Sequence, residues 1–447
     1  MTSEARVPIA EVVSGRRGLF LIALLLAEFG AAMQGIAYST VLPVVAQDLD
    51  GFALFGATLA AGNIAAVAML AIAPLVLGRF RPRAVLLTAT LLYVIGVGMA
   101  VAAPEMVWVL AGAVVRGVAA GLLAGFGLGA IGALYDERTR PRVFGLFSLI
   151  WLLPSFVGPA LNAVITEWAG WRWALAWPAV LVLAARALMG RYVSAVPWER
   201  HRSSARPASG LVVAAFLAIG AWGSTVPDAW GRAVFAGGAV GAAVGIVIFL
   251  RSAARRPRRA LITFAVLCAG YFGIYEMLSL IVVEGLGESV IWASIAISGG
   301  LIAWSVAGLR PRPRSRIDLV VVGTTLIPVS IGVLLGALTM PEPWAVATVI
   351  ASAVIAGLGM GLAYPLLSSE PFGPHNASGP SHASTIGALV AFAETSGTAW
   401  SALLGGGLYS VLQAAGAAPH AALPIALLAI AVPAVAGVGM SIVRVRD

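Results

Sequence analysis

The chain has 447 residues, of which 60% are hydrophobic and 11% are charged. Soluble domains carry about 25% charged residues, so this composition excludes a disordered chain and argues against a soluble enzyme. A mean hydropathy of +0.97 is typical of a polytopic membrane protein. Each of its helices needs about 20 apolar residues to cross about 30 Å of hydrocarbon. We therefore expect an all-α membrane protein with many spans and short loops.

Apolar runs between Pro, Gly and Arg residues predict 14 transmembrane helices. The first run is too long for the core of a signal peptide and is interpreted as a retained span. The runs at 209–226 and 232–250 form a central two-helix insert, for which a re-entrant or interfacial hairpin is the alternative. In chain order the spans cover 18–46, 53–77, 84–103, 107–134, 143–166, 173–193, 209–226, 232–250, 260–283, 288–308, 318–338, 344–366, 383–412 and 421–443.

The positive charge of the chain gathers in alternate loops. All 28 basic residues are Arg, and the net charge is +9. Most of them lie in the N-terminal tail, the C-terminus and the loops at 78–83, 135–142, 191–208, 251–259 and 309–317. By the positive-inside rule both termini are cytoplasmic, in a multi-pass protein of the plasma (inner) membrane. Arginines scattered among short loops do not form the basic face that binds nucleic acid.

The two ends of the chain repeat one pattern. Arg16–Gly18 aligns with Arg258–Ala260, and the same register places Gln34 opposite Glu276. Each half then has an Arg/Pro-rich loop after its second span. This predicts an N-terminal six-helix bundle (1–193), a linker with the two-helix insert (194–259) and a C-terminal six-helix bundle (260–447). Paired bundles with a substrate site between them are a transporter architecture.

Four motifs in these spans are familiar. Gln34–Leu49 contains Val-Leu-Pro and ends in Asp-Leu, Arg116 is followed by small residues, Gly158-Pro159 lies in the fifth span, and Gly170–Trp173 reads Gly-Trp-Arg-Trp. In order and spacing they resemble the fourteen-helix drug:proton antiporters of the major facilitator superfamily. That resemblance implies the major facilitator fold and proton-coupled efflux of small lipophilic compounds. The family usually has Asp at the position of Gln34.

The resemblance and the prolines also indicate residues for gating. The loop after the second span, with Arg79, Arg81 and Arg83, corresponds to the gating loop of the family. Pro154, Gly158 and Pro159 are expected to bend the fifth span, because proline removes a backbone donor.

Ionisable residues inside spans are the candidates for proton coupling, because charge at bilayer depth is costly and is usually functional. They are Glu276, Glu28, Glu394 and Arg116. Glu276 ranks first, since the repeat places it where the first helix of the family carries its acid. A structural hydrogen bond to a neighbouring helix is the alternative role for each.

The predicted substrate contacts lie beside these acids. Tyr271, Phe272 and Tyr275 surround Glu276, and Gln34 and Tyr38 form a similar polar–aromatic pair in the first span. An acid among aromatic rings suits a lipophilic ligand, including a cationic one. Ordinary aromatic packing is the alternative.

The sequence also argues against disulfides, metals and cofactors, and it contains one pattern of small residues. The single cysteine, Cys268, excludes an internal disulfide and a cysteine-based metal site. No metal and no cofactor are predicted, and no phosphate-cradling loop indicates direct ATP drive. Glycines recur every four residues after Arg116, which predicts close packing inside the bundle; dimerisation is the alternative.

The sequence therefore predicts a secondary active transporter, not an enzyme. Its expected partners are a small-molecule substrate, protons and the lipid bilayer, with no nucleic acid. Uptake or uniport of another small solute is the alternative within transport. A membrane-embedded enzyme acting on lipids is the alternative from another class.

Overall fold

The computed structural model describes residues 12–446 except 136–138, 140–142, 144, 145, 147–149, 151, 197–207, 254–257, 310–315, 343 and 373–379. Its described part contains helices and no strands. The α-helices, in chain order, are α2 (Gly15–Asp48), α3 (Phe52–Arg79), α4 (Pro82–Val101), α5 (Met106–Leu134), α7 (Leu152–Ala169), α8 (Trp171–Ala176), α9 (Pro178–Tyr192), α10 (Ala208–Gly223), α11 (Ala229–Ala253), α12 (Arg258–Leu280), α13 (Val290–Leu309), α14 (Arg316–Ala337), α15 (Trp344–Ser369), α16 (Pro380–Ala402), α17 (Leu408–Ala414) and α18 (Pro419–Arg446). Short segments η1 (Val193–Ala195), η2 (Ile281–Gly285), η3 (Glu370–Phe372) and η4 (Leu403–Gly407) extend or join them.

Every predicted span contains a helix, and the predicted all-helical fold is confirmed. Among the described residues, 11 helices are long and apolar enough to cross a membrane. Helix α10 has 16 residues and is shorter than these. At about 1.5 Å per residue it extends about 24 Å, so a full crossing by the insert stays a prediction.

Local chemistry places several of the helix ends. Pro82 and Pro178 each begin a helix, where the missing amide hydrogen has no partner in any case. Gly170, between α7 and α8, has φ +89°, a conformation that glycine adopts without strain. The sharp change of direction there leads directly into the Trp-Arg-Trp sequence.

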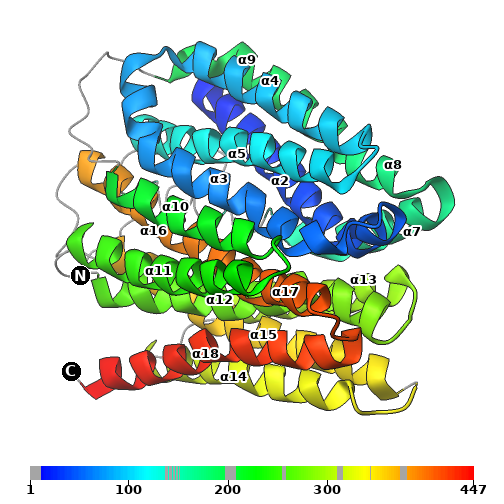
Figure 1. Cartoon of the computed structure of the whole chain (residues 1–447). Helices are drawn as coiled ribbons and strands as arrows, with labels where there is room; N and C mark the ends of the chain where they lie inside the picture. The colour runs from blue at the N-terminus through cyan, green and yellow to red at the C-terminus, as the bar shows by residue number, and fades with distance from the viewer. Residues whose placement is uncertain are drawn as a thin grey trace.

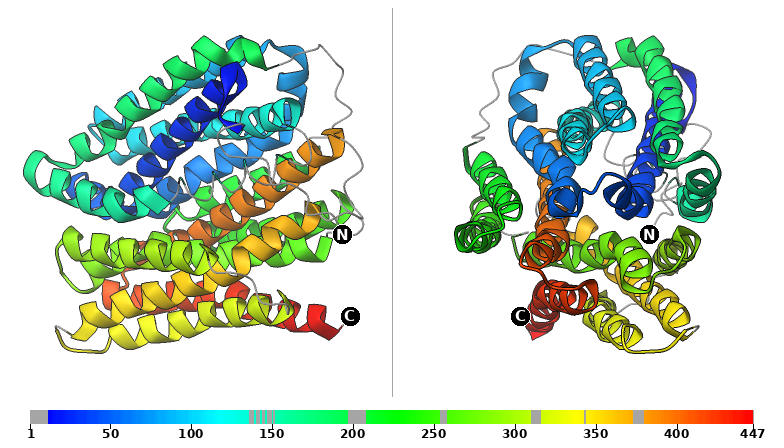
Figure 2. Two further views of the ribbon diagram at one scale, coloured as in Figure 1. Left: turned by 180° about the vertical axis from the view of Figure 1, so that it is seen from behind. Right: turned by 45° about the vertical axis from the view of Figure 1, so that its right-hand side comes forward.

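The helices gather into two bundles. Helices α2–α9 form one group (the N-terminal bundle), helices α12–α18 form the other (the C-terminal bundle), and both ends of the chain lie on the same side (Figure 1). Toward the termini the two bundles lean apart, while at the opposite end they meet (Figure 2). The division of the chain at residues 193 and 259 stays a prediction.

The insert α10–α11 lies beside both bundles rather than between them. A side chain at Gly210 of α10 would meet Ala71 of α3, so these two helices touch closely. On the other bundle, Trp400 Nε1 of α16 donates a hydrogen bond of 2.9 Å to the carbonyl oxygen of Ala239 in α11. The hairpin therefore bridges the flank of the molecule.

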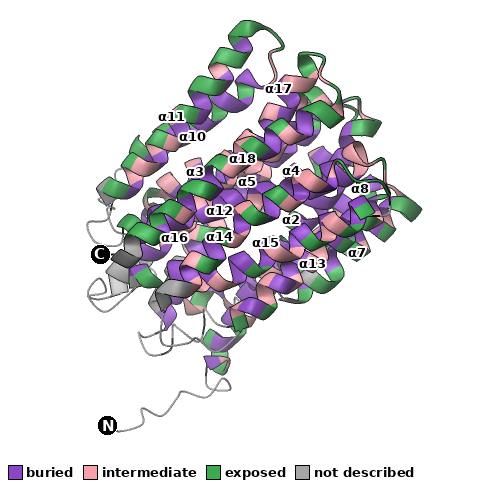
Figure 3. Ribbon diagram, turned by 90° about the horizontal axis from the view of Figure 1, so that it is seen from below, coloured by how far each residue is buried: buried purple, intermediate pink, exposed green. Residues whose placement is uncertain are grey.

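The outer surface is apolar, as lipid contact requires. In α11, Val240, Val244 and Ile248 are all exposed and lie on one helix face. Exposed residues line the outward faces of the peripheral helices, while buried residues face the centre (Figure 3).

Candidate transport site

The membrane arginine of the N-terminal bundle rests on an aromatic ring. The guanidinium carbon of Arg116, in α5, lies 3.6 Å from the centroid of the Tyr38 ring in α2. Both side chains are partly exposed. The Nε of Arg116 and the hydroxyl of Tyr38 are buried without a hydrogen-bond partner. The structure thus places together two residues that the sequence assigned to proton coupling and to substrate binding.

Gln34 points into its own bundle. Its Nε2 donates a hydrogen bond of 3.1 Å to the carbonyl oxygen of Leu175 in α8, and its Oε1 accepts one of 2.6 Å from the Tyr93 hydroxyl in α4. The residue is 3% exposed. Its amide therefore links three helices, and a direct role in substrate binding stays a prediction.

Arg186 in α9 is a buried cation inside the predicted span 173–193, and it was not among the residues predicted for proton coupling. Its guanidinium carbon lies 5.8 Å from the Tyr93 ring, and its Nε and Nη1 are buried without a hydrogen-bond partner. Glu28 of α2 is close enough for its charge to act on Arg186 and on Glu394 of the other bundle. The sequence feature that could have identified Arg186 is its position within an apolar run.

Direct hydrogen bonds join the bundles from mid-helix to the end opposite the termini. Ser39 of α2 donates to the Tyr275 hydroxyl of α12 at 3.0 Å, and Ser279 donates to the carbonyl oxygen of Thr40 at 2.5 Å. Nearer that end, the Glu167 carboxylate accepts a hydrogen bond of 2.6 Å from Ser289. These hydroxyl contacts close this end of the bundle interface.

Glu276 is more buried than Glu28 and Glu394, the other two acids predicted for proton coupling. It is 8% exposed, and its Oε2 is buried without a hydrogen-bond partner. It follows Tyr275 directly in α12, so it lies one residue from the contact between the bundles. A carboxyl group in this position is shielded from bulk water. It also lies next to a contact between the bundles that has to change during transport.

An aromatic cluster lines α12 on the same stretch. Tyr271 packs edge-on against Trp304 of α13 at 5.2 Å between ring centroids, and Phe272 lies 6.1 Å from the same ring. Tyr364 of α15 extends the cluster, 5.3 Å from Trp304. The sequence identified the α12 rings but not Trp304 and Tyr364, which carry no local signal within apolar runs.

Glu394 of α16 is held by that cluster. The Tyr364 hydroxyl donates a hydrogen bond of 3.0 Å to Glu394 Oε2. Glu394 is partly exposed, unlike Glu276. Of these two acids in the C-terminal bundle, Glu394 is thus bound by a tyrosine, whereas Glu276 has an oxygen without a partner.

Comparison with known proteins agrees with this arrangement. A model of the Major Facilitator Superfamily matches residues 24–402. The chain belongs to the Major Facilitator Superfamily. The resemblance predicted from the motifs is confirmed at this level.

Relatives within the superfamily include drug exporters. The multidrug efflux pump SdrM of Staphylococcus aureus is 28% identical over 153 residues, which is 34% of each chain. The multidrug transporter protein MdtP of Bacillus subtilis is 23% identical over 158 residues, 35% of this chain and 29% of that protein. The aligned stretch spans 27% to 34% of the length of the first curated relatives that the chain matches.

Solved facilitator structures share the fold over the whole chain. The human organic anion transporter MFSD10 superposes with a TM-score of 0.61 at 12% identity, covering 94% of this chain and 99% of that one. At this identity the similarity concerns the fold alone.

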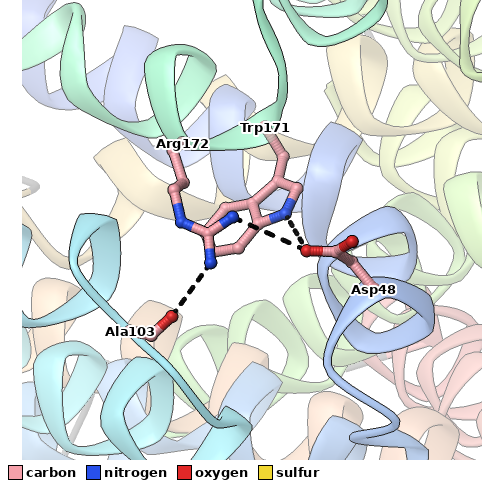
Figure 4. A network of polar contacts seen from close by, with 4 residues as sticks. All are labelled: Asp48, Ala103, Trp171 and Arg172. Atoms are coloured by element: carbon pink, nitrogen blue, oxygen red, sulfur yellow. Dashed lines mark hydrogen bonds and ion pairs between the residues drawn. The ribbon is translucent and has the colours of Figure 1, made fainter.

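The facilitator motifs meet at the end opposite the termini. Asp48, which closes the first-span motif, accepts a hydrogen bond of 2.8 Å from Trp171 Nε1 and lies 3.6 Å from Arg172 Nη1 (Figure 4). Arg172 also donates to the carbonyl oxygen of Ala103 at 3.1 Å and lies over the Trp171 ring. Residues from two motifs that are far apart in the sequence therefore form one polar network that joins α2, α8 and the α4–α5 loop.

The remaining motif residues serve helix packing in this conformation. Gly158 lies against Met33 and Ile36 of α2, where a side chain would meet both. Pro154 and Pro159 are buried within α7. Arg79, Arg81 and Arg83 are exposed at the end of α3 and the start of α4. A gating role for these residues stays a prediction.

Proposed function

We propose that this facilitator exports small lipophilic compounds from the cytoplasm in exchange for protons. The two bundles alternate access to a site between them. Membership of a transporter superfamily and the names of the two bacterial relatives support export. The proposed site comprises Arg116 and Tyr38 on one bundle and Glu276 with the aromatic cluster on the other.

The observation that carries the proton coupling is the surroundings of Glu276. An unpaired carboxylate away from water costs far more free energy than a neutral carboxyl group. Glu276 is 8% exposed with one oxygen unpartnered, so we infer that it holds a proton in this conformation. Separation of the bundles at Ser39 and Tyr275 exposes it to water on the outer side, where it takes up this proton. Export then requires the proton to leave toward the cytoplasm when the next substrate molecule binds. Glu394 and Glu28 are the further carriers.

The test uses inverted membrane vesicles and a panel of lipophilic dyes, with and without an imposed pH gradient. Glu276→Gln keeps the hydrogen-bonding capacity but cannot ionise. We expect it to lower gradient-driven dye accumulation at least tenfold. The matched control is Glu105→Gln, which neutralises an exposed acid in the α4–α5 loop. Normal accumulation by Glu276→Gln, Glu394→Gln and Glu28→Gln alike would refute proton coupling and favour uniport.

The surface of the molecule supports a definite orientation. Exposed tryptophans at the ends of helices gather opposite the termini: Trp108, Trp168, Trp173, Trp222, Trp230, Trp292 and Trp344. Apart from Arg172 and Arg232, the exposed arginines of the described residues gather at the other end: Arg16, Arg17, Arg79, Arg81, Arg83, Arg191, Arg251, Arg258 and Arg259. Tryptophan favours the membrane interface and arginine marks the cytoplasmic side. We infer that both termini face the cytoplasm of the cell that makes this protein, in its plasma membrane.

Cysteine labelling tests this orientation. In a Cys268→Ala background, Arg81→Cys should react with a membrane-impermeant thiol reagent only in inverted vesicles. Asp228→Cys, in the turn of the insert, should react only in intact cells. Reaction of both from one side would show that the insert does not cross the membrane. Reaction of Arg81→Cys from outside would reverse the orientation.

A further inference from the structure

The N-terminal bundle holds two arginines that form no ion pair within the part of the chain that the structure describes. Arg116 of α5 and Arg186 of α9 lie inside apolar helices. Charged groups at bilayer depth are costly and are almost always paired. This bundle therefore has an excess of positive charge that an anion would neutralise.

Arg116 is built to receive that anion. Its stem is confined, because even a methyl group on Gly96 of α4 would lie 2.6 Å from Arg116 Cγ. Its guanidinium carbon lies 3.6 Å from the centroid of the Tyr38 ring, and Nε is buried with no acceptor. A ring against its face holds a guanidinium while leaving the N–H donors along its edge available. Those donors match a carboxylate or sulfonate in a bidentate arrangement.

Arg186 adds to the positive potential at the same place. It is 8% exposed, with Nε and Nη1 unpartnered, and it lies near Tyr93. The charges of both arginines act on the Tyr93 ring. Glu28 contributes one negative charge nearby, which leaves the two arginines only partly balanced. The Tyr93 hydroxyl donates its hydrogen to Gln34 Oε1, so it is not available to donate to a bound anion.

We propose that Arg116 binds the anionic group of the transported compound and that Arg186 strengthens this binding electrostatically. The substrate class is then a lipophilic carboxylate or sulfonate. Its apolar body lies toward the aromatic cluster, because Tyr38 precedes Ser39, which contacts Tyr275 of that cluster. This assignment rests on the proposed transport function and replaces the cationic preference that Glu276 suggested.

Equilibrium binding to the purified full-length protein in a non-ionic detergent tests the assignment without a proton gradient. The probes are 1-naphthoate, 1-naphthalenemethanol and 1-naphthylmethylammonium, which share one ring system and differ in charge. We expect 1-naphthoate to bind most tightly. Arg116→Gln should weaken it roughly 10- to 100-fold, the range expected for a charge-assisted hydrogen-bonded pair, and should leave the neutral alcohol unchanged.

Three further variants separate this site from a general effect of charge or folding. Arg251→Gln removes an exposed arginine of the insert and should leave 1-naphthoate binding unchanged. Arg116→Lys keeps the charge and should weaken binding less than Arg116→Gln. Arg186→Gln should weaken 1-naphthoate binding by a smaller factor than Arg116→Gln does. If Arg116→Gln does not fold, the Lys and Arg186 variants still decide the question.

The inference is overturned if 1-naphthylmethylammonium binds more tightly than 1-naphthoate, or if Arg116→Gln and Arg251→Gln behave alike. It is also overturned if 1-naphthalenesulfonate fails to compete with 1-naphthoate. Loss of pH-driven transport in the Glu276 variant together with charge-independent binding would reject this anion site while leaving proton-coupled export intact. Normal pH-driven transport in the Glu276 variant together with preferred binding of 1-naphthoate would reject proton coupling and leave the anion site intact.

Discussion

Glu276 and Gln34 occupy matched positions in the two halves of the chain, yet their polar atoms have opposite surroundings. Both polar atoms of the Gln34 amide are hydrogen-bonded inside the N-terminal bundle. Glu276 Oε2 has no partner at all. An amide that joins three helices is suited to a static role, whereas an acid without a partner is suited to changing its protonation. We expect that the repeat pairs a structural position, Gln34, with a functional one, Glu276.

Replacement of Gln34 measures this difference. Gln34→Leu leaves the buried Tyr93 hydroxyl without its acceptor, and an unsatisfied buried group costs about 1–3 kcal/mol. We expect a lower unfolding temperature in detergent, with substrate affinity changed much less than stability. Tyr93→Phe combined with Gln34→Leu should recover part of the loss, since neither partner then remains unsatisfied. An unchanged unfolding temperature with lost binding would instead place Gln34 in the substrate site.

At this scale the sequence identified the ionisable residues but not their partners. Depth within an apolar run is visible in the sequence, so Glu276, Glu394 and Arg116 were all predicted as candidates. Tyr93 and Tyr364 were not, because a tyrosine in an apolar run gives no signal until the neighbouring helix is known. Partners that lie on other helices depend on packing, which the local pattern does not contain.

The glycines of helix α5 show that a pattern within one helix can predict how closely that helix packs. The glycines after Arg116 were predicted to pack inside the bundle, and this is confirmed. A side chain at Gly117 would lie 2.1 Å from the carbonyl oxygen of Gly62, and one at Gly121 would lie 2.6 Å from that of Ala66. Backbone contact between α3 and α5 therefore requires glycine at these positions.

Two alanine substitutions separate this packing from helix propensity. Gly117→Ala should reduce the yield of folded protein and its unfolding temperature, because the rigid α3 backbone cannot move aside. Gly98→Ala, in α4, meets no atom within 4 Å and should be neutral or stabilising by up to about 1 kcal/mol, the helix-propensity difference. Size-exclusion profiles and thermal unfolding of both variants report the result. Equal behaviour of the two variants would contradict close α3–α5 contact.

For the whole molecule, hydropathy and loop charge were sufficient to predict the order of the helices. Within lipid, the backbone amide and carbonyl groups must form hydrogen bonds inside the protein, so an apolar run of sufficient length becomes a helix. The conformation adopted by the two bundles was not predictable in this way. Contacts such as Ser39–Tyr275 and Glu167–Ser289 join helices of different halves, and the hydropathy pattern does not contain them. The arginine loop 135–142 lies largely outside the described residues.

The contacts between bundles at the end opposite the termini lead to the last prediction. Alternating access requires these contacts to break in every cycle. Ser289 and the Glu167 carboxylate are exposed and 2.6 Å apart. A Glu167→Cys/Ser289→Cys pair in a Cys268→Ala background, joined by a short bifunctional methanethiosulfonate, should therefore lose nearly all dye transport. Reduction of the cross-link should restore transport.

The control cross-link joins two positions within one bundle. Met340 and Thr348, 3.4 Å apart between Sδ and Oγ1, both belong to the C-terminal bundle near the same end. A Met340→Cys/Thr348→Cys pair joined by the same reagent should leave transport unchanged, since a rigid bundle moves as a unit. Full transport by the Glu167–Ser289 cross-linked protein would show that this end stays closed during the cycle. Equal inhibition by both cross-links would show that motion within the C-terminal bundle contributes to transport. In either case rocking of two rigid bundles would fail as the mechanism.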